Sequence, residues 1–138
     1  MAKHLLSKET YARLEAEVAE LEHTVLPAIA DKIGRAREMG DLSENGDYHA
    51  AKDEQGHMEG RIRQLEHLIE NAEIIDGPAE GTVGAGSVVT IVYEGDDDDM
   101  AEQYLLGHPE ETPPVGVGIM SLNSPLGTAL VGHREGDW

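Results

Sequence analysis

The sequence predicts an α+β protein in which a long antiparallel α-helical coiled-coil hairpin is followed by a small β-rich domain. Three observations support this fold class. Glycine is absent before Gly34, apolar residues in the first half recur at spacings of three and four, and the second half is rich in Gly, Pro, Val and Thr. The first two features favour helices, and the third favours strands and turns. We therefore predict two domains, the hairpin over residues 1–75 and the β-rich domain over residues 76–138.

The first helix is expected to begin after Ser7, whose hydroxyl is a suitable N-cap. Its apolar residues recur at spacings of four, three, four and four, which keeps them on one face of a helix. Pro27 should bend the helix without ending it, because the apolar pattern continues to Ile33. The residues of this stripe are Leu14, Val18, Leu21, Val25 and Ile29.

A second apolar stripe predicts a second long helix that faces the first. Its members are three or four residues apart, and only one of them is polar. The link between the helices, residues 38–47, is short enough to force an antiparallel hairpin, and it carries several acidic residues. The stripe consists of Tyr48, Ala51, Gln55, Met58, Ile62, Leu65 and Ile69.

The second domain is predicted to hold three strands and a short helix. Alternating segments at residues 87–93, 103–107 and 117–121 are typical of strands separated by turns. Residues 124–130 should form a helix with Ser124 as its cap and Pro125 in its first turn. Because the chain stops at Trp138, where another strand is expected, we predict a domain that lacks its last strands.

Composition limits the classes of function. The 138-residue chain has 28 Asp and Glu against 10 Lys and Arg, a formal net charge of −18, which argues against general attraction to nucleic acid and favours a basic partner surface. Cysteine is absent, which excludes disulfides and thiolate metal sites. No segment resembles a signal peptide or a membrane span, so we expect a cytoplasmic protein with no membrane partner.

Four segments of the sequence resemble one known family. They read REMGDLSEN at residues 37–45, YHAAK at 48–52, EGRI at 59–62 and NSPLG at 123–127. In this order they are similar to the Gre transcript-cleavage factors of bacterial RNA polymerase, GreA-like members in particular. The resemblance implies a finger that enters the secondary channel of the polymerase. It also implies an FKBP-like second domain that docks on the channel rim.

The resemblance further implies a chemical role for the end of the finger. Asp41 and Glu44 would lend carboxylates to a Mg²⁺ ion held jointly with RNA polymerase, so that the polymerase cleaves the 3′ end of backtracked nascent RNA. Two-metal phosphodiester hydrolysis needs such hard oxygen ligands. The polymerase would then be the enzyme, and this chain would be its removable, monomeric cofactor. No tightly bound metal is expected in the isolated protein.

Other residues receive roles from the same resemblance. Arg37 and Lys52 correspond to contacts with the extruded RNA, although Lys52 stands where the family commonly has Arg and loses bidentate phosphate geometry. Asn45 and Tyr48 are expected to shape the tip. The expected polymerase-docking residues are Ser121, Asn123, Ser124 and Pro125.

Several alternatives remain open from the residues alone. Asp41 and Glu44 also fit a capping box, with Asp41 as the cap and Glu44 at the third helical position. Tyr48 could serve packing as well as tip function, and Arg61 and Arg63 could be solvated or paired with Glu. Two other functions are a Gre-fold inhibitor that binds polymerase without supporting cleavage and a structural coiled-coil adaptor unrelated to transcription.

Overall fold

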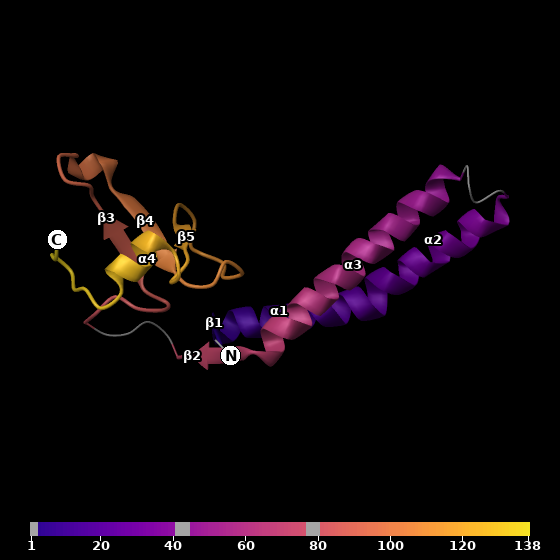
Figure 1. Cartoon of the computed structure of the whole chain (residues 1–138), viewed down its shortest axis with the longest axis horizontal. Helices are drawn as coiled ribbons and strands as arrows, with labels where there is room; N and C mark the ends of the chain where they lie inside the picture. The colour runs from indigo at the N-terminus through magenta and orange to yellow at the C-terminus, as the bar shows by residue number, and fades with distance from the viewer. Residues whose placement is uncertain (1–2, 41–44, 77–80) are drawn as a thin grey trace. The chain divides into compact units, whose positions relative to one another are not determined.

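The computed structural model describes residues 3–40, 45–76 and 81–138, and it divides the chain into two compact units. The helical unit consists of residues 12–71, and the β unit combines residues 1–11 with residues 72–138. Helices and strands are therefore largely segregated, which confirms the predicted α+β class (Figure 1).

The long helices form where the apolar stripes predict them. Helix α1 spans Lys8–Glu20, the π-helical segment η1 spans Leu21–Val25, and α2 spans Leu26–Glu38. Helix α3 spans Gly46–Glu70 and packs along α2 (Figure 1). The start of α1 directly after Ser7 is confirmed, as is the hairpin of two long helices.

Pro27 lies in the first turn of α2, immediately after the π-helical segment. The Leu26 N–H bonds to the Leu21 carbonyl, one residue farther back than in an α-helix. The wider π turn makes room for the proline ring, which would otherwise collide with the carbonyl four residues earlier. The prediction that the helix continues through Pro27 is confirmed.

The core of the helical unit uses most of the predicted stripes. From α3 the buried residues include Ala51, Ile62 and Leu65, as predicted. Leu68 is buried where Ile69 was predicted, so the stripe is wrong by one residue at its last position. A step of three after Leu65 keeps Leu68 on the core face of a 3.6-residue helix. The first helical segments contribute Leu14, Leu21, Ile29, Ile33 and Ala36.

Gly56 lies in the interior of α3, and a Cβ atom built there meets nothing within 4 Å. We predict that Gly56→Ala raises the free energy of unfolding by about 1 kcal/mol, because alanine loses less backbone entropy in a helix. Gly40→Ala is the matched contrast, since Gly40 also has open space but a φ of +124°. That variant should be destabilised. Chemical denaturation of both variants checks the prediction, and equal signs for the two changes would contradict it.

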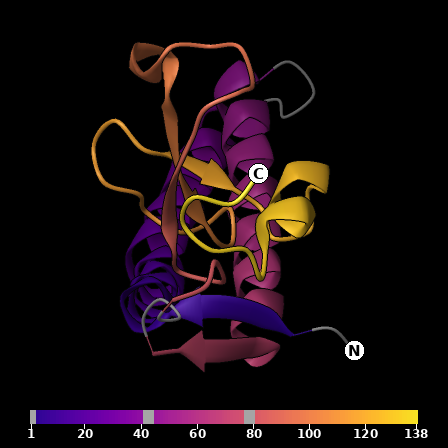
Figure 2. The same ribbon diagram turned by 90° about the vertical axis from the view of Figure 1, so that its left-hand side faces the viewer.

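The β unit contains a pair of strands that the sequence analysis did not predict. Strand β1, His4–Ser7, runs parallel to β2, Ala72–Ile75, with His4 opposite Ala72 (Figure 2). Because of this pairing the first residues of the chain group with residues 72–138, whereas the predicted hairpin domain included them.

The carboxylate of Glu111 holds the end of β1. Its two oxygens accept hydrogen bonds from the Ser7 N–H at 2.8 Å, the Ser7 hydroxyl at 2.7 Å and the Thr10 hydroxyl at 2.7 Å. Thr10 is buried, so its hydroxyl needs this partner. The contact fastens the start of α1 to the segment that follows β4.

The second sheet follows the prediction. It has the order β3-β4-β5, with β3 at Val88–Ile91, β4 at Glu102–Leu106 and β5 at Gly118–Met120. Strand β4 is antiparallel to β3 and parallel to β5. A 3₁₀ turn, η3 at Asp98–Met100, precedes β4, and helix α4 at Pro125–Leu130 follows β5. Leu106 and Met120 are buried in this unit.

In the part of the chain that the structure describes, no helix has the length and apolar character needed to cross a bilayer.

Candidate functional site

The candidate site lies where α2 ends and α3 begins. Helix α2 ends at Glu38, and Gly40 follows with a φ of +124°, a conformation that favours glycine. Helix α3 begins at Gly46. Asp41 and Glu44, the predicted metal-binding carboxylates, lie outside the described residues, so their role stays a prediction.

Asn45 links the two helices through its side-chain amide. Its Oδ1 accepts a hydrogen bond from the Tyr48 N–H at 3.0 Å, which makes Asn45 the N-cap of α3. Its Nδ2 donates to the Ala36 carbonyl near the end of α2 at 2.7 Å. The capping-box alternative for Asp41 and Glu44 falls on residues outside those the structure describes and is not tested. The tip-shaping role predicted for Asn45 remains a prediction.

Tyr48 has the packing role that was left open for it, and its tip-shaping role remains a prediction. Its side chain is partly buried against the cluster formed by Ile29, Ile33 and Ala51. The Arg37 guanidinium lies over the Tyr48 ring, 5.9 Å from its centroid, within the range of a cation–π contact. Tyr48 thus belongs to the packing of the hairpin and also touches a predicted RNA-contact residue.

The two predicted RNA-contact residues lie on opposite helices of the hairpin. Arg37 is exposed near the end of α2, and Lys52 is exposed in the second turn of α3. Lys52 Nζ donates to Gln55 Oε1 at 3.1 Å, a neutral partner that leaves its charge uncompensated by that contact. Positive charge therefore flanks the acidic link on both sides.

Arg61 forms a two-point ion pair across the hairpin. Its Nε lies 2.7 Å from Glu17 Oε2 and its Nη2 lies 3.2 Å from Glu17 Oε1. This confirms pairing with Glu as the interpretation for Arg61. Arg63 is exposed on the same helix.

The predicted docking residues surround the start of α4. The Ser124 hydroxyl donates to the Ser121 carbonyl at 2.7 Å and accepts from the Gly127 N–H at 3.0 Å, so it is the N-cap of α4. Asn123 and Pro125 are exposed beside it. Ser121 and Ser124 therefore shape this turn, and Asn123 and Pro125 are the two whose side chains a partner could reach.

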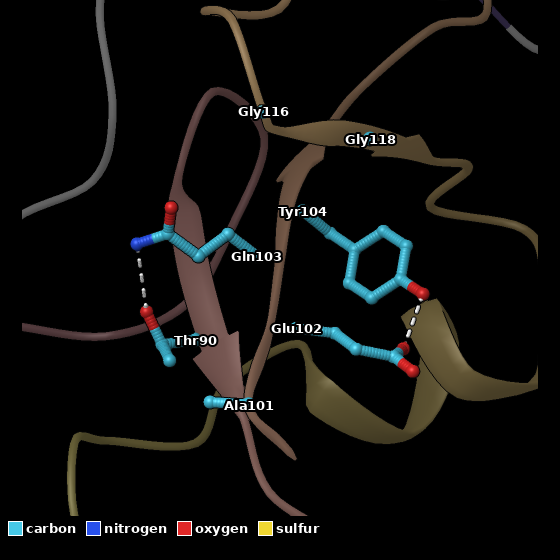
Figure 3. A pocket seen from close by; sticks show the side chains of 7 residues that line it. All are labelled: Thr90, Ala101, Glu102, Gln103, Tyr104, Gly116 and Gly118. Carbon is cyan, nitrogen blue, oxygen red and sulfur yellow. Dashed lines mark hydrogen bonds between the residues drawn. The ribbon is translucent and has the colours of Figure 1, made fainter. Parts of the chain in front are cut away.

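A shallow hollow of about 540 Å³ lies beside β4 (Figure 3). Its polar side chains bond to one another, with Gln103 donating to Thr90 and the Tyr104 hydroxyl donating to Glu102. The hydrogen bond to Glu102 raises the pKa of the Tyr104 phenol above its ordinary value. None of the sequence-predicted site residues that the structure describes lines this hollow.

His108 gives the β unit a pH-sensitive contact. Its Nδ1 accepts a hydrogen bond from the Glu110 N–H at 3.0 Å, and its ring meets the His4 ring edge-on at 5.3 Å. Burial lowers the pKa of His108 below 6.5, nearby His4 lowers it further, and Glu110 and Glu111 oppose these effects.

We predict that stability falls as the pH drops through about 6.5, because the unfolded chain then binds a proton that folded His108 resists. The contribution of neutral His108 is present above that pH and is lost as the pH falls through the lower pKa of the folded protein. Chemical denaturation between pH 7.5 and pH 5 should show a shallower pH dependence in His108→Gln, and identical slopes would contradict the prediction.

Within residues 3–40, 45–76 and 81–138, no three His, Asp or Glu side chains form a group able to hold a metal ion.

The sequence analysis did not identify the contact between Arg37 and Tyr48 or the bond from Asn45 to Ala36. The sequence did contain a signal for the contact between Arg37 and Tyr48, because these two residues are equally far from the middle of the link. Residues in such positions face each other across an antiparallel hairpin. The second depends on a backbone carbonyl, which carries no sequence signal.

Two family descriptions together match nearly the whole chain. "Transcription elongation factor, N-terminal" matches residues 4–74, and "Transcription elongation factor, GreA/GreB, C-term" matches residues 78–138. The curated transcription elongation factor GreA of Saccharopolyspora erythraea is 47% identical over 133 residues, which cover 96% of this chain and 80% of that protein. The GreA of Paracoccus denitrificans is 38% identical over 138 residues, covering 99% and 86%.

Solved structures of GreA factor homolog 1 (Gfh1) resemble the chain as well. The Thermus aquaticus protein superposes with a TM-score of 0.51 at 28% identity, over 99% of this chain and 87% of that one. The Thermus thermophilus protein gives 0.50 at 28% identity, over 98% and 86%. One family description matches the helical hairpin, the other matches the β unit, and the curated relatives match nearly the whole chain. The chain belongs to the GreA/GreB family of transcription elongation factors.

Proposed function

We propose that this elongation factor inserts its hairpin into the secondary channel of bacterial RNA polymerase and stimulates the polymerase to cleave backtracked nascent RNA. The observation that carries the proposal is the construction of the hairpin end. Asn45 fastens α2 to α3, exposed Arg37 and Lys52 flank the link, and the link itself contains the carboxylates of Asp41 and Glu44. The protein would act in the cytoplasm, where transcripts are made.

The residues of the link fit a shared magnesium ion by the chemistry of their donors. Asp41 and Glu44 offer hard carboxylate oxygens, and magnesium typically takes one or two protein carboxylates and completes its ligands with water and phosphate. Capping α3 requires neither residue, because Asn45 caps it. The chemistry that a second magnesium ion supplies in such a site is stabilisation of charge on the attacking and leaving oxygens.

The basic residues would hold the extruded RNA strand. Arg37 can meet a phosphate with two parallel N–H donors, whereas Lys52 acts as a single point charge. Without them the acidic link would repel the transcript, since the protein carries a net charge of −18. The same negative charge would favour insertion of the hairpin into a channel lined by basic residues.

The β unit would dock outside the channel through the turn before α4. Asn123 and Pro125 are exposed there, and Ser121 and Ser124 hold the turn by hydrogen bonds. Rigid turns of this kind present side chains with little loss of entropy on binding.

A purified RNA polymerase complex backtracked by a defined number of nucleotides tests the proposal. Addition of the protein with Mg²⁺ should release short 3′ RNA fragments much faster than the polymerase alone. Arg63→Gln is a matched control for removal of the charge of Arg37 or Lys52, because it removes one exposed positive charge farther along α3. This variant should stimulate cleavage normally.

The two alternative functions predict different results in the same system. An inhibitor would slow nucleotide addition on an active complex and release no fragments from the backtracked one. A structural adaptor would not associate with polymerase. Either result would overturn the proposed function.

A further inference from the structure

Three contacts and one peptide bond at the hairpin end form a closed circuit. The Arg37 guanidinium lies over the Tyr48 ring, and the Tyr48 N–H donates to Asn45 Oδ1. Asn45 Nδ2 donates to the Ala36 carbonyl, and Ala36 precedes Arg37 in the chain. The circuit therefore leaves α2, crosses to α3 and returns to the residue next to its starting point.

Two groups of the circuit, the Ala36 carbonyl and the Tyr48 ring, are held in place by their surroundings. Ala36 is 3% exposed and lies in helix α2, so its carbonyl has a fixed direction. The Tyr48 ring is packed against Ile29, Ile33 and Ala51. Arg37 is exposed, and its only anchor in the circuit is the ring beneath it. A free arginine side chain has many rotamers, and contact with a fixed ring reduces their number.

The contact with the ring also suits phosphate recognition. A cation–π contact uses the charge of the guanidinium and the face of the ring, and it does not consume the N–H donors. Those donors form the planar fork that binds phosphate at two points. Tyr48 can thus restrict Arg37 without competing for its hydrogen bonds.

We propose that Tyr48, seated by Asn45, is a positioning residue that presents the Arg37 guanidinium to a phosphate of the extruded RNA. The RNA-binding part of this inference rests on the proposed function. Lys52 lies outside the circuit, since its side chain contacts Gln55. It therefore supplies an internal comparison.

Cleavage assays on a backtracked complex test the effect on function. Tyr48→Leu keeps an apolar side chain and loses the ring, and it should raise the factor concentration for half-maximal cleavage about two- to fivefold. The maximal rate should stay close to that of the parent. Tyr48→Phe keeps the ring and should behave like the parent. Thermal unfolding of each variant shows whether the hairpin is intact.

Double variants separate positioning from a general loss of structure. Combining Tyr48→Leu with Arg37→Gln should add little to Arg37→Gln alone, because the ring then has no guanidinium to hold. Combining Tyr48→Leu with Lys52→Gln should multiply the two losses. If Tyr48→Leu weakens both backgrounds equally, its role is structural and the inference is overturned.

Nuclear magnetic resonance of the free protein tests the contact without polymerase. The side-chain protons of Arg37 should be shifted upfield by the Tyr48 ring current, and the shift should persist in Tyr48→Phe and vanish in Tyr48→Leu. Asn45→Asp keeps the acceptor for the Tyr48 N–H and loses the donor to the Ala36 carbonyl, so it should reduce the shift. Absence of any shift in the parent would overturn the positioning role.

The two measurements distinguish failure of this inference from failure of the proposed function. A clear ring-current shift together with no stimulated cleavage by the parent would reject the function and leave the contact established. A clear shift, normal stimulation by the parent and unchanged half-maximal concentration in Tyr48→Leu would reject the positioning of RNA alone.

Discussion

Replacing Asp41 by Asn and Glu44 by Gln is expected to abolish stimulated transcript cleavage while leaving the binding of polymerase intact. The substitutions preserve side-chain size and remove the two negative charges that would attract a magnesium ion. Metal stabilisation of a phosphodiester transition state amounts to several kcal/mol, so the rate should fall by about 100-fold or more. Fragment release from a defined backtracked complex measures the loss, and competition with labelled parent protein measures binding.

The single variants and the metal concentration sharpen this test. Asp41→Asn and Glu44→Gln should each be partly rescued by raising the Mg²⁺ concentration, because a weakened site fills by mass action. The double variant should still slow cleavage by the parent when both are present, since it competes for the same channel. Undiminished release by the double variant would show that the two carboxylates are not needed for cleavage.

Gly127→Ala should severely destabilise the β unit. A Cβ atom at this buried position would overlap the Ser121 carbonyl oxygen and lie 2.9 Å from Ser124 Oγ, the atom that caps α4. A clash with backbone cannot be relieved by a rotamer change, so we expect a loss of about 3 kcal/mol or more. Thermal unfolding followed by circular dichroism should show the midpoint lowered by roughly 10 °C or more.

Gly118→Ala provides the control for this prediction. Its Cβ would approach the Tyr104 ring at 3.2 Å and the Gln103 carbonyl oxygen at an ordinary 3.9 Å, and the partly exposed Tyr104 side chain can turn aside. We expect a much smaller change in the unfolding midpoint. If Gly127→Ala unfolds at the same temperature as Gly118→Ala, the close approach of α4 to Ser121 is not maintained in solution.

Local patterns predicted much of the fold. Apolar periodicity located both long helices, and alternation located β3, β4 and β5, because each of these signals is contained in a short window of sequence. The parallel pairing of β1 with β2 was not predicted, because the residues that pair, such as His4 and Ala72, are far apart in the chain. The hydrogen bond from Ser7 to the Glu111 carboxylate was not predicted for the same reason.

The sequence predicted residues at the end of the hairpin more fully than it predicted the contacts between them. Resemblance supplied Arg37, Asn45, Tyr48 and Lys52, and all four lie near the end of the hairpin. The choice of N-cap could not be made from sequence, because Asp41 and Asn45 both suit a cap and helix starts are set by packing as well as by side chains. Packing of Tyr48 against the helical core agrees with the later start.

The pairing of β1 with β2 has a consequence for how the polypeptide matures on the ribosome. Residues 4–7 are synthesised before both long helices and their partner residues 72–75 after them, so β1 must wait with its hydrogen-bonding edge unpaired. Leu6, fully buried in the finished protein, is exposed to other nascent chains during that interval. Deletion of residues 4–7 should therefore impair the unit that contains residues 72–138.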